Sequence, residues 1–146
     1  LFLRNKKINR DNMINKKKIS VLDHYNWWLG NENKIRKNYK FKISDNKIIY
    51  IWHKIIKFRK KYLIGGWFSS GRDIPVTLKI AALKWQIKQT KKYKIKWIGV
   101  IKKNNISTLK LNTMIGFKKM VKNSEIYKHT LSIFKISAKK YHLVYY

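Results

Sequence analysis

Few side chains in this 146-residue sequence can carry acid–base or metal chemistry. The chain has six acidic residues, four histidines and no cysteine, which excludes disulfides and thiolate metal sites. The histidines are scattered along the chain, so we expect no metal site. Histidine titrates near neutral pH, and His53, at the end of an expected strand, could take a proton from an amine. A structural role for His53 is the alternative.

A candidate phosphate site lies where an expected strand, a loop and a helix follow one another. Residues 62–68 predict the strand, residues 71–77 the loop, and the helix begins at Thr77. Free backbone N–H groups and the positive end of the helix dipole meet at such a helix start. The junction is weak evidence by itself, because every strand–loop–helix unit contains one.

The elements around this junction predict an α/β protein with a mostly antiparallel sheet. The apolar positions of the long helix recur at helical spacing, at Val76, Ile80, Leu83 and Ile87. Residues 95–101 are apolar on both faces, as expected of a strand covered on both sides. Residues 105–117 predict a short helix that ends in Gly-Phe.

The N-terminal half predicts a helix followed by a hairpin. Ser20 can cap a helix over residues 22–29, which Gly30 would end. Residues 38–44 alternate between apolar and basic side chains and predict a half-buried strand, with residues 47–53 as its hairpin partner.

The remaining segments give weaker patterns. We expect a loop over residues 58–61 and two strands over residues 117–121 and 127–136. Gly65-Gly66 predicts either a bulge that splays the strand or close packing. The basic, aromatic tail to residue 146 has no clear assignment.

The net charge of +30 would suit a nucleic-acid-binding protein, since a dense basic surface attracts phosphate backbones. However, lysine, isoleucine, asparagine and tyrosine are abundant together, as an AT-rich coding sequence produces whatever the function. The lysines are also spread along the whole chain. We therefore favour a solvated basic surface that binds nucleic acid only nonspecifically.

The length predicts a single domain over residues 1–146. No run of about 18 uncharged apolar residues is present, so we expect no membrane-spanning helix, no membrane partner and a cytoplasmic location. The sequence opens with Leu1 rather than methionine, which suggests a truncated N-terminus.

The segment from Asn105 through Asn112 to Phe117 resembles the Asn-x-x-(Ala/Ser)-x-x-x-(Tyr)-x-x-x-Gly-Phe segment of the GNAT acyl-CoA N-acyltransferases. The strand, helix and Gly-Phe follow in that family's order. Residues 72–77 also line up with the family's pyrophosphate loop. The resemblance implies the GNAT fold, with helices on both faces of the sheet.

The N-terminal part resembles one branch of this family. Arg4-Asn5 with Arg10, and then the stretch from Ile19 to His24, are similar to the opening of the pseudaminic-acid-type enzymes, which acetylate UDP-linked amino sugars. The resemblance therefore implies an N-acetyltransferase with acetyl-CoA as co-substrate. Its acceptor would be a small-molecule amine, here a nucleotide-linked amino sugar.

The resemblance also assigns roles to residues. The strand at residues 67–69 would splay from the strand at residues 97–100 and hold the pantetheine arm through its backbone. A strand N–H would stabilise the oxyanion, while the helix start would hold the pyrophosphate. His24 would contact the substrate or act as base, and Asn112 occupies the position of the general acid. The cofactor-binding candidates are Trp67, Phe68, Ser69, Gly71, Arg72, Val76, Thr77 and Asn105.

Two departures from the family pattern leave other functions open. Pro75 replaces a loop glycine and has no N–H for a phosphate. Asn112 stands where many members have tyrosine, and an amide cannot usefully donate a proton to a thiolate. An inactive relative is therefore an alternative, as are a protein or polyamine N-acetyltransferase and a basic nucleic-acid-binding domain. The pair Trp27-Trp28 could stack on a sugar or uracil ring, or pack in the core.

Overall fold

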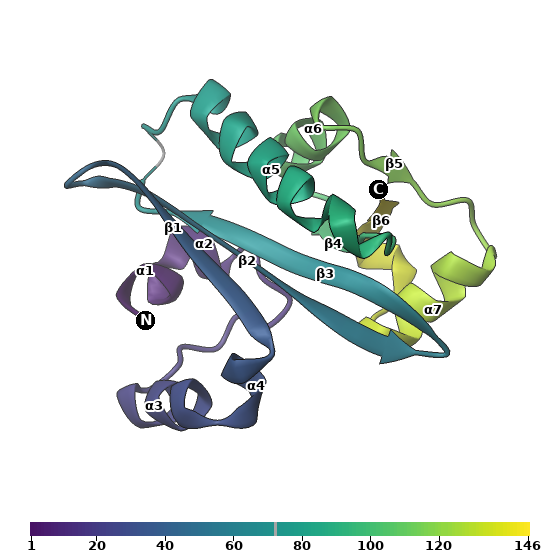
Figure 1. Cartoon of the computed structure of the whole chain (residues 1–146), viewed down its shortest axis with the longest axis horizontal. Helices are drawn as coiled ribbons and strands as arrows, with labels where there is room; N and C mark the ends of the chain where they lie inside the picture. Colours follow the sequence, from purple (N-terminus) through teal and green to yellow (C-terminus); the bar gives the residue numbers. More distant parts are fainter. Residues whose placement is uncertain (72) are drawn as a thin grey trace.

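The computed structural model describes residues 1–71 and 73–146, and leaves the side chains of residues 32 and 33 undescribed. Two three-stranded antiparallel sheets, ordered β1-β2-β3 and β4-β6-β5, carry helices on both faces (Figure 1). The strands are β1 (Arg36–Ser44), β2 (Lys47–Phe58), β3 (Lys60–Ser69), β4 (Ile98–Lys102), β5 (Lys118–Lys119) and β6 (Tyr141–Tyr145). The helices are α1 (Phe2–Asn5), α2 (Lys7–Arg10), α3 (Val21–Leu29), α4 (Asn31–Lys34), α5 (Val76–Thr90), α6 (Ile106–Met114) and α7 (Glu125–Phe134), with 3-10 turns η1 (Lys91–Tyr93) and η2 (Ala138–Lys140). This architecture confirms the predicted fold class.

The predicted N-terminal elements form as expected. The Ser20 Oγ accepts a hydrogen bond from the Asp23 N–H at 2.9 Å, so it caps α3. The β1–β2 hairpin forms around residues 45–46, and Tyr39 lies opposite Ile51 in its register. Residues 58–61 are not the expected loop, because β2 and β3 meet in a tight turn at Arg59, whose φ is 54°.

The glycine pair in β3 reflects close packing, and the register between β2 and β3 runs without a bulge from residue 49 to residue 69. A Cβ on Gly65 would lie 2.4 Å from the Trp52 carbonyl oxygen and 2.7 Å from the ring of Trp97. A Cβ on Gly66 would lie 3.0 Å from the Trp52 indole nitrogen, on the other face of the strand. Only glycine therefore fits at residue 65 without a shift of its neighbours.

The helix α5 lies along β3 and covers one face of the first sheet (Figure 1). It buries Ala82 and Leu83 against Ile49, Ile51 and Leu63 from the strands. The same core extends to Trp97, whose indole donates to the Thr90 hydroxyl at 2.9 Å. The opposite face holds a second core, where α7 packs over Tyr62, Ile64 and Ile98.

The C-terminal part corrects the sequence prediction. Residues 127–136 are not a strand, because most of them belong to α7, whose cap Ser124 accepts a hydrogen bond from the Tyr127 N–H at 3.3 Å. Of the strand expected over residues 117–121, only β5 forms. The unassigned tail becomes β6, the central strand of the second sheet.

Candidate functional site

The two sheets are joined at one point and then diverge. Leu63 of β3 and Trp97 form a single parallel bridge, in which the Leu63 N–H donates to the Lys96 oxygen at 2.9 Å. Beyond this bridge, no backbone hydrogen bond joins β3 to β4 in the part of the chain that the structure describes. We call this interval, between residues 64–69 and residues 98–102, the strand opening. The splayed strands expected from the resemblance are therefore present.

The register shows which backbone groups face the strand opening. Ser70 donates to the Ile48 oxygen at 2.9 Å, so alternate residues of β3 bond to β2, and the residues between them face away from it. Trp67 is one of these, and it is partly exposed. Next to β4, Trp97 exchanges two backbone hydrogen bonds with Tyr146, which follows β6. Every second residue from Trp97 therefore bonds to β6, and the backbone of Val100, which lies between two of these, faces β3. An extended ligand can therefore pair with free N–H and C=O groups on both sides.

The other two strand candidates are engaged within the protein. The backbone of Phe68 pairs with Tyr50 in β2, and their rings stack 5.3 Å apart. The Ser69 hydroxyl donates to the Gly71 oxygen at 2.9 Å, and its own carbonyl accepts from the Asn9 amide at 3.2 Å. Trp67 is thus the one of the three whose backbone N–H and C=O are both free in the strand opening, and the cofactor roles of Phe68 and Ser69 stay predictions.

The first turn of α5 is open for an anion. Pro75 provides no side-chain cap and the turn contains no acidic residue. Among the described residues, no acceptor is hydrogen-bonded to the N–H of Val76 or Thr77, and both residues are exposed. No described side chain therefore plugs this helix end.

The loop before α5 adds one unfavourable charge. The Asp73 carboxylate lies beside Gly71, where a Cβ would meet its Oδ1 at 2.5 Å. Lys47 partly balances this carboxylate across 3.7 Å. Arg72, expected to contact the pyrophosphate, lies outside the described residues.

Of the two asparagine candidates, Asn105 is the N-cap residue of α6 and Asn112 lies within that helix. The Asn105 Oδ1 caps this helix, because it accepts from the Thr108 N–H and the Ser107 hydroxyl, each at 3.2 Å. Its amide nitrogen has no described partner and remains able to bind a cofactor carbonyl. The Asn112 amide donates back to the Thr108 oxygen at 2.9 Å. Its assignment near the leaving thiolate stays a prediction.

The two candidate bases lie in aromatic surroundings. His24, on α3, stacks on Trp27 at 5.7 Å, and burial lowers its pKa, with the N-terminal amine adding to the effect. His53 is 2% exposed, between Tyr39 and Trp97, and its buried Nδ1 has no partner. Burial lowers the pKa of His53, and Lys37 adds to the shift, so His53 is neutral at pH 7. Its environment is that of a core histidine.

The Arg-Asn segment has a structural role that the sequence did not reveal. Arg4 donates to the backbone oxygens of Lys17 and Asn15 at 2.7 and 2.9 Å. Asn5 both donates to and accepts from the backbone of Ile19, at 2.7 and 3.0 Å, and Arg10 donates to the Asn5 oxygen at 2.9 Å. These side chains fold the loop that precedes α3.

This folded segment reaches both strands of the opening. Asn9 of α2 bonds the Ser69 oxygen on β3, while Lys102 of β4 donates to the Asp11 oxygen at 2.6 Å. The segment therefore ties the ends of β3 and β4 together. The sequence signal for this structural role was the grouping of Arg4, Asn5 and Arg10. Most of their hydrogen-bond partners lie too far along the chain to be predicted.

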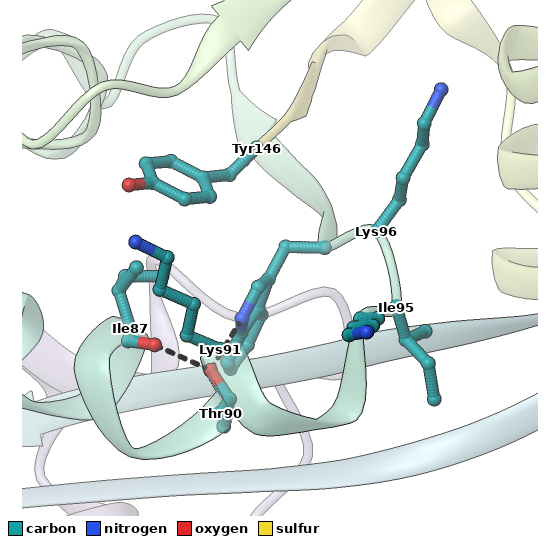
Figure 2. A pocket seen from close by; sticks show the side chains of 8 residues that line it. Ile87, Thr90, Lys91, Ile95, Lys96 and Tyr146 are labelled. Atoms are coloured by element: carbon teal, nitrogen blue, oxygen red, sulfur yellow. Dashed lines mark hydrogen bonds between the residues drawn. The ribbon is translucent and has the colours of Figure 1, made fainter.

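A cavity of about 270 Å³ lies at the other end of α5, away from the strand opening (Figure 2). Figure 2 shows the ring of Tyr146 across from Lys91, with the Thr90 hydroxyl bonded within its own helix. Lys94 and Lys96 also line this cavity. Its position at the C-terminal end of the helix separates it from the candidate phosphate site.

Metal sites and membrane-spanning helices are both absent from the described part of the chain. Among the side chains that the structure describes, which exclude those of residues 32, 33 and 72, no three histidine, aspartate or glutamate residues gather in a way that could hold a metal ion. None of the described helices is long and apolar enough to cross a bilayer.

No protein-family model matches the sequence, and no curated protein is significantly similar to it. Solved structures do match. A domain from Methanocaldococcus jannaschii DSM 2661 aligns with a TM-score of 0.63 and 15% identity, over 99% of this chain and 87% of that one. An acetyltransferase of the GNAT family from Streptococcus pneumoniae gives a TM-score of 0.60 and 12% identity, over 99% and 88%.

A candidate phosphinothricin N-acetyltransferase aligns with a TM-score of 0.55 and 13% identity, over 98% of this chain and 86% of that one. At such identities the likeness is one of fold, and it does not distinguish one branch of acetyltransferases from another. The strand opening and the neighbouring helix start fit the same conclusion. The chain therefore has the fold of the GNAT N-acetyltransferases.

Proposed function

We propose that this protein transfers an acetyl group from acetyl-CoA to the amino group of a small molecule. The observation that carries the proposal is the divergence of β3 and β4 after the bridge at Leu63, beside the uncapped first turn of α5. Unpaired strand groups suit an extended amide-containing arm, and a free helix start suits its phosphates.

In this reaction the acceptor nitrogen attacks the thioester carbonyl, the new C–N bond forms, and the C–S bond breaks as the thiolate leaves. The Trp67 N–H faces the opening, and in this mechanism it would stabilise the oxyanion. The Asn105 amide would hold the arm of the cofactor. The amine loses a proton to water or to a base, and the thiolate takes its proton from solvent, because the Asn112 amide cannot serve as the general acid.

We further propose that the acceptor is anionic, with a nucleotide-linked amino sugar as the first candidate. A chain with a net charge of +30 repels polyamines and attracts phosphates. The resemblance of residues 4–24 to the pseudaminic-acid-type branch supports the sugar, although Arg4, Asn5 and Arg10 are engaged with the backbone here. This acceptor is a proposal that rests on charge and resemblance.

Thermal unfolding with acetyl-CoA, adenosine diphosphate or buffer alone, in 0.15 M salt, tests cofactor binding. A ligand that binds only the folded state raises the melting temperature. At a ligand concentration of one hundred times its dissociation constant, it stabilises the folded state by about 2.7 kcal/mol. We expect a shift with acetyl-CoA that grows with the logarithm of its concentration and exceeds the shift with adenosine diphosphate. No shift at millimolar acetyl-CoA would remove the basis for the proposal.

The variant Val76→Asp places a carboxylate in the exposed first turn of α5. We expect the free protein to keep or gain stability, by about 0.3–1 kcal/mol, because a negative charge suits a helix start. The shift with acetyl-CoA should shrink, because the same charge repels its phosphates. Val121→Asp, at a residue 74% exposed in a loop, makes the same chemical change elsewhere and should leave the shift intact. Equal shifts in both variants would place the phosphates elsewhere.

A further inference from the structure

An arginine is held between two tryptophans on the face of the first sheet opposite α5. The guanidinium carbon of Arg36, at the start of β1, lies 3.7 Å from the ring centre of Trp52 on β2. It lies 5.1 Å from the ring centre of Trp27 on α3. We call these three residues the arginine stack. Side chains alternate between the two faces along paired strands. The register of β1 and β2 therefore puts Arg36 and Trp52 on the sheet face that bears α7, opposite α5.

The guanidinium has no polar partner within the described part of the chain. Its Nε is sealed from solvent and makes no hydrogen bond. The two terminal nitrogens make none either, but they are not among the sealed atoms, so they keep access to solvent. The carboxylates seen in ion pairs serve other cations: Asp45 pairs with Lys42, Asp73 with Lys47, and Glu125 with Lys60.

The arrangement costs free energy in the absence of a ligand. Burial lowers the pKa of Arg36 to about 10, which reflects a charge removed from water without a compensating anion. Stacking on two indoles offsets part of this cost and fixes the plane of the guanidinium. A fixed plane with free terminal N–H groups is preorganised for the two oxygens of a phosphate.

We propose that Arg36 is an anion-binding residue, and that its terminal N–H groups hold a phosphate group of the acceptor. The Trp52 indole lies against Gly66 of β3, where a Cβ would meet its nitrogen at 3.0 Å, so the stack borders the strand opening on the side opposite α5. A phosphate held there would leave the amine end of the molecule free to approach the thioester. The role in acceptor binding rests on the proposed function, whereas binding of the anion itself does not.

Nuclear magnetic resonance of the wild-type protein tests the binding site by site. Inorganic phosphate, and then uridine diphosphate, are titrated in 0.15 M sodium chloride while the Nε–H of Arg36 and the indole N–H groups of Trp27 and Trp52 are followed. We expect these three signals to shift together and to saturate at about millimolar ligand, a binding free energy of about −4 kcal/mol. Shifts confined to other residues, or a linear drift without saturation, would overturn the proposal.

Matched variants separate the arginine stack from the general basic charge. Arg36→Gln should weaken phosphate binding by about tenfold, the equivalent of about 1.4 kcal/mol. Lys88→Gln removes the same charge from an exposed position on α5 and should change it less than twofold. Arg36→Lys keeps the charge but lacks the planar guanidinium group. Its affinity for phosphate should lie between those of the Arg36→Gln and Lys88→Gln variants. Equal affinities of the Arg36→Gln and Lys88→Gln variants would refute the proposal.

Failure of the anion site can be told apart from failure of the proposed function. Phosphate binding at Arg36 and the melting shift with acetyl-CoA are measured separately in the wild-type protein. Saturable phosphate binding at Arg36 without an acetyl-CoA shift would keep the anion site and reject the acetyltransferase. An acetyl-CoA shift without phosphate or uridine diphosphate binding at Arg36 would keep the acetyltransferase and reject this acceptor site.

Discussion

The side-chain oxygen of Asn105 caps α6, whereas its amide nitrogen is free to bind a ligand. These two roles can be separated by substitution. Asn105→Ser keeps an oxygen that can cap α6 and removes the free amide, whereas Asn105→Ala removes both. We expect the alanine variant alone to lose about 1 kcal/mol of stability. Both variants should bind acetyl-CoA more weakly, as measured by calorimetric titration. Wild-type affinity in the serine variant would show that Asn105 only caps the helix.

His53 should make stability fall in mild acid. Its pKa is lowered in the folded state by burial and by Lys37, so the unfolded chain takes up the proton first as the pH falls. Stability is therefore lost as the pH drops below the unfolded value of about 6.5. His53→Phe keeps a ring in the pocket beside Tyr39 and removes the proton site. Urea unfolding from pH 8 to pH 5 should show a shallower loss for the variant, and an equal loss would contradict this account.

At the scale of single elements, α7 depends on a cap that the sequence analysis overlooked. The Ser124 Oγ accepts from the Tyr127 N–H at 3.3 Å, and α7 then brings His129 within 2.6 Å of the Tyr62 hydroxyl. Ser124→Ala should lower the free energy of unfolding by about 1 kcal/mol. Ser132→Ala, on the same helix, is the control and should change the free energy of unfolding by less than about 0.5 kcal/mol. Equal losses in urea unfolding would exclude the cap as the cause.

The elements that were predicted correctly are those whose signals are local. The α5 helix shows apolar residues at helical spacing, and the β1–β2 hairpin shows alternation on both sides of a two-residue turn. Residues 127–136 contain enough β-branched and aromatic residues to suggest a strand, and the competing signal was the single serine cap. The strand β6 lies between β4 and β5 and pairs with both, and local patterns in the sequence do not show such long-range pairing.

At the scale of the whole molecule, the general location of the candidate site was predictable but its polar details were not. The strand–loop–helix order located the opening and the start of α5. The arginine stack joins Trp27, Arg36 and Trp52 from three elements, so no spacing in the sequence could reveal it. Which backbone groups face the opening depends on the register between strands, and a shift by one residue would replace Trp67 by its neighbours.

The net charge of +30 gives a prediction for the entire chain. Self-repulsion destabilises a compact state, and salt screens it over a Debye length of about 10 Å at 0.1 M. The ion pairs that salt would weaken are exposed and worth about 0–1 kcal/mol each. We therefore expect the melting temperature to rise between 0.05 and 0.5 M sodium chloride, at roughly constant pH.

The same salt series decides between the acetyltransferase and a nucleic-acid-binding protein. Duplex binding through phosphate contacts falls steeply and linearly on a logarithmic salt scale, by about three to five orders of magnitude between 0.05 and 0.2 M for six to ten contacts. Acetyl-CoA is also held by unpaired strand groups at Trp67 and Val100 in the proposed complex, and these contacts carry no charge. Its melting shift should therefore persist at 0.3 M salt, where duplex binding has vanished. The reverse order, with duplex binding retained and the acetyl-CoA shift lost, would favour the nucleic-acid-binding protein.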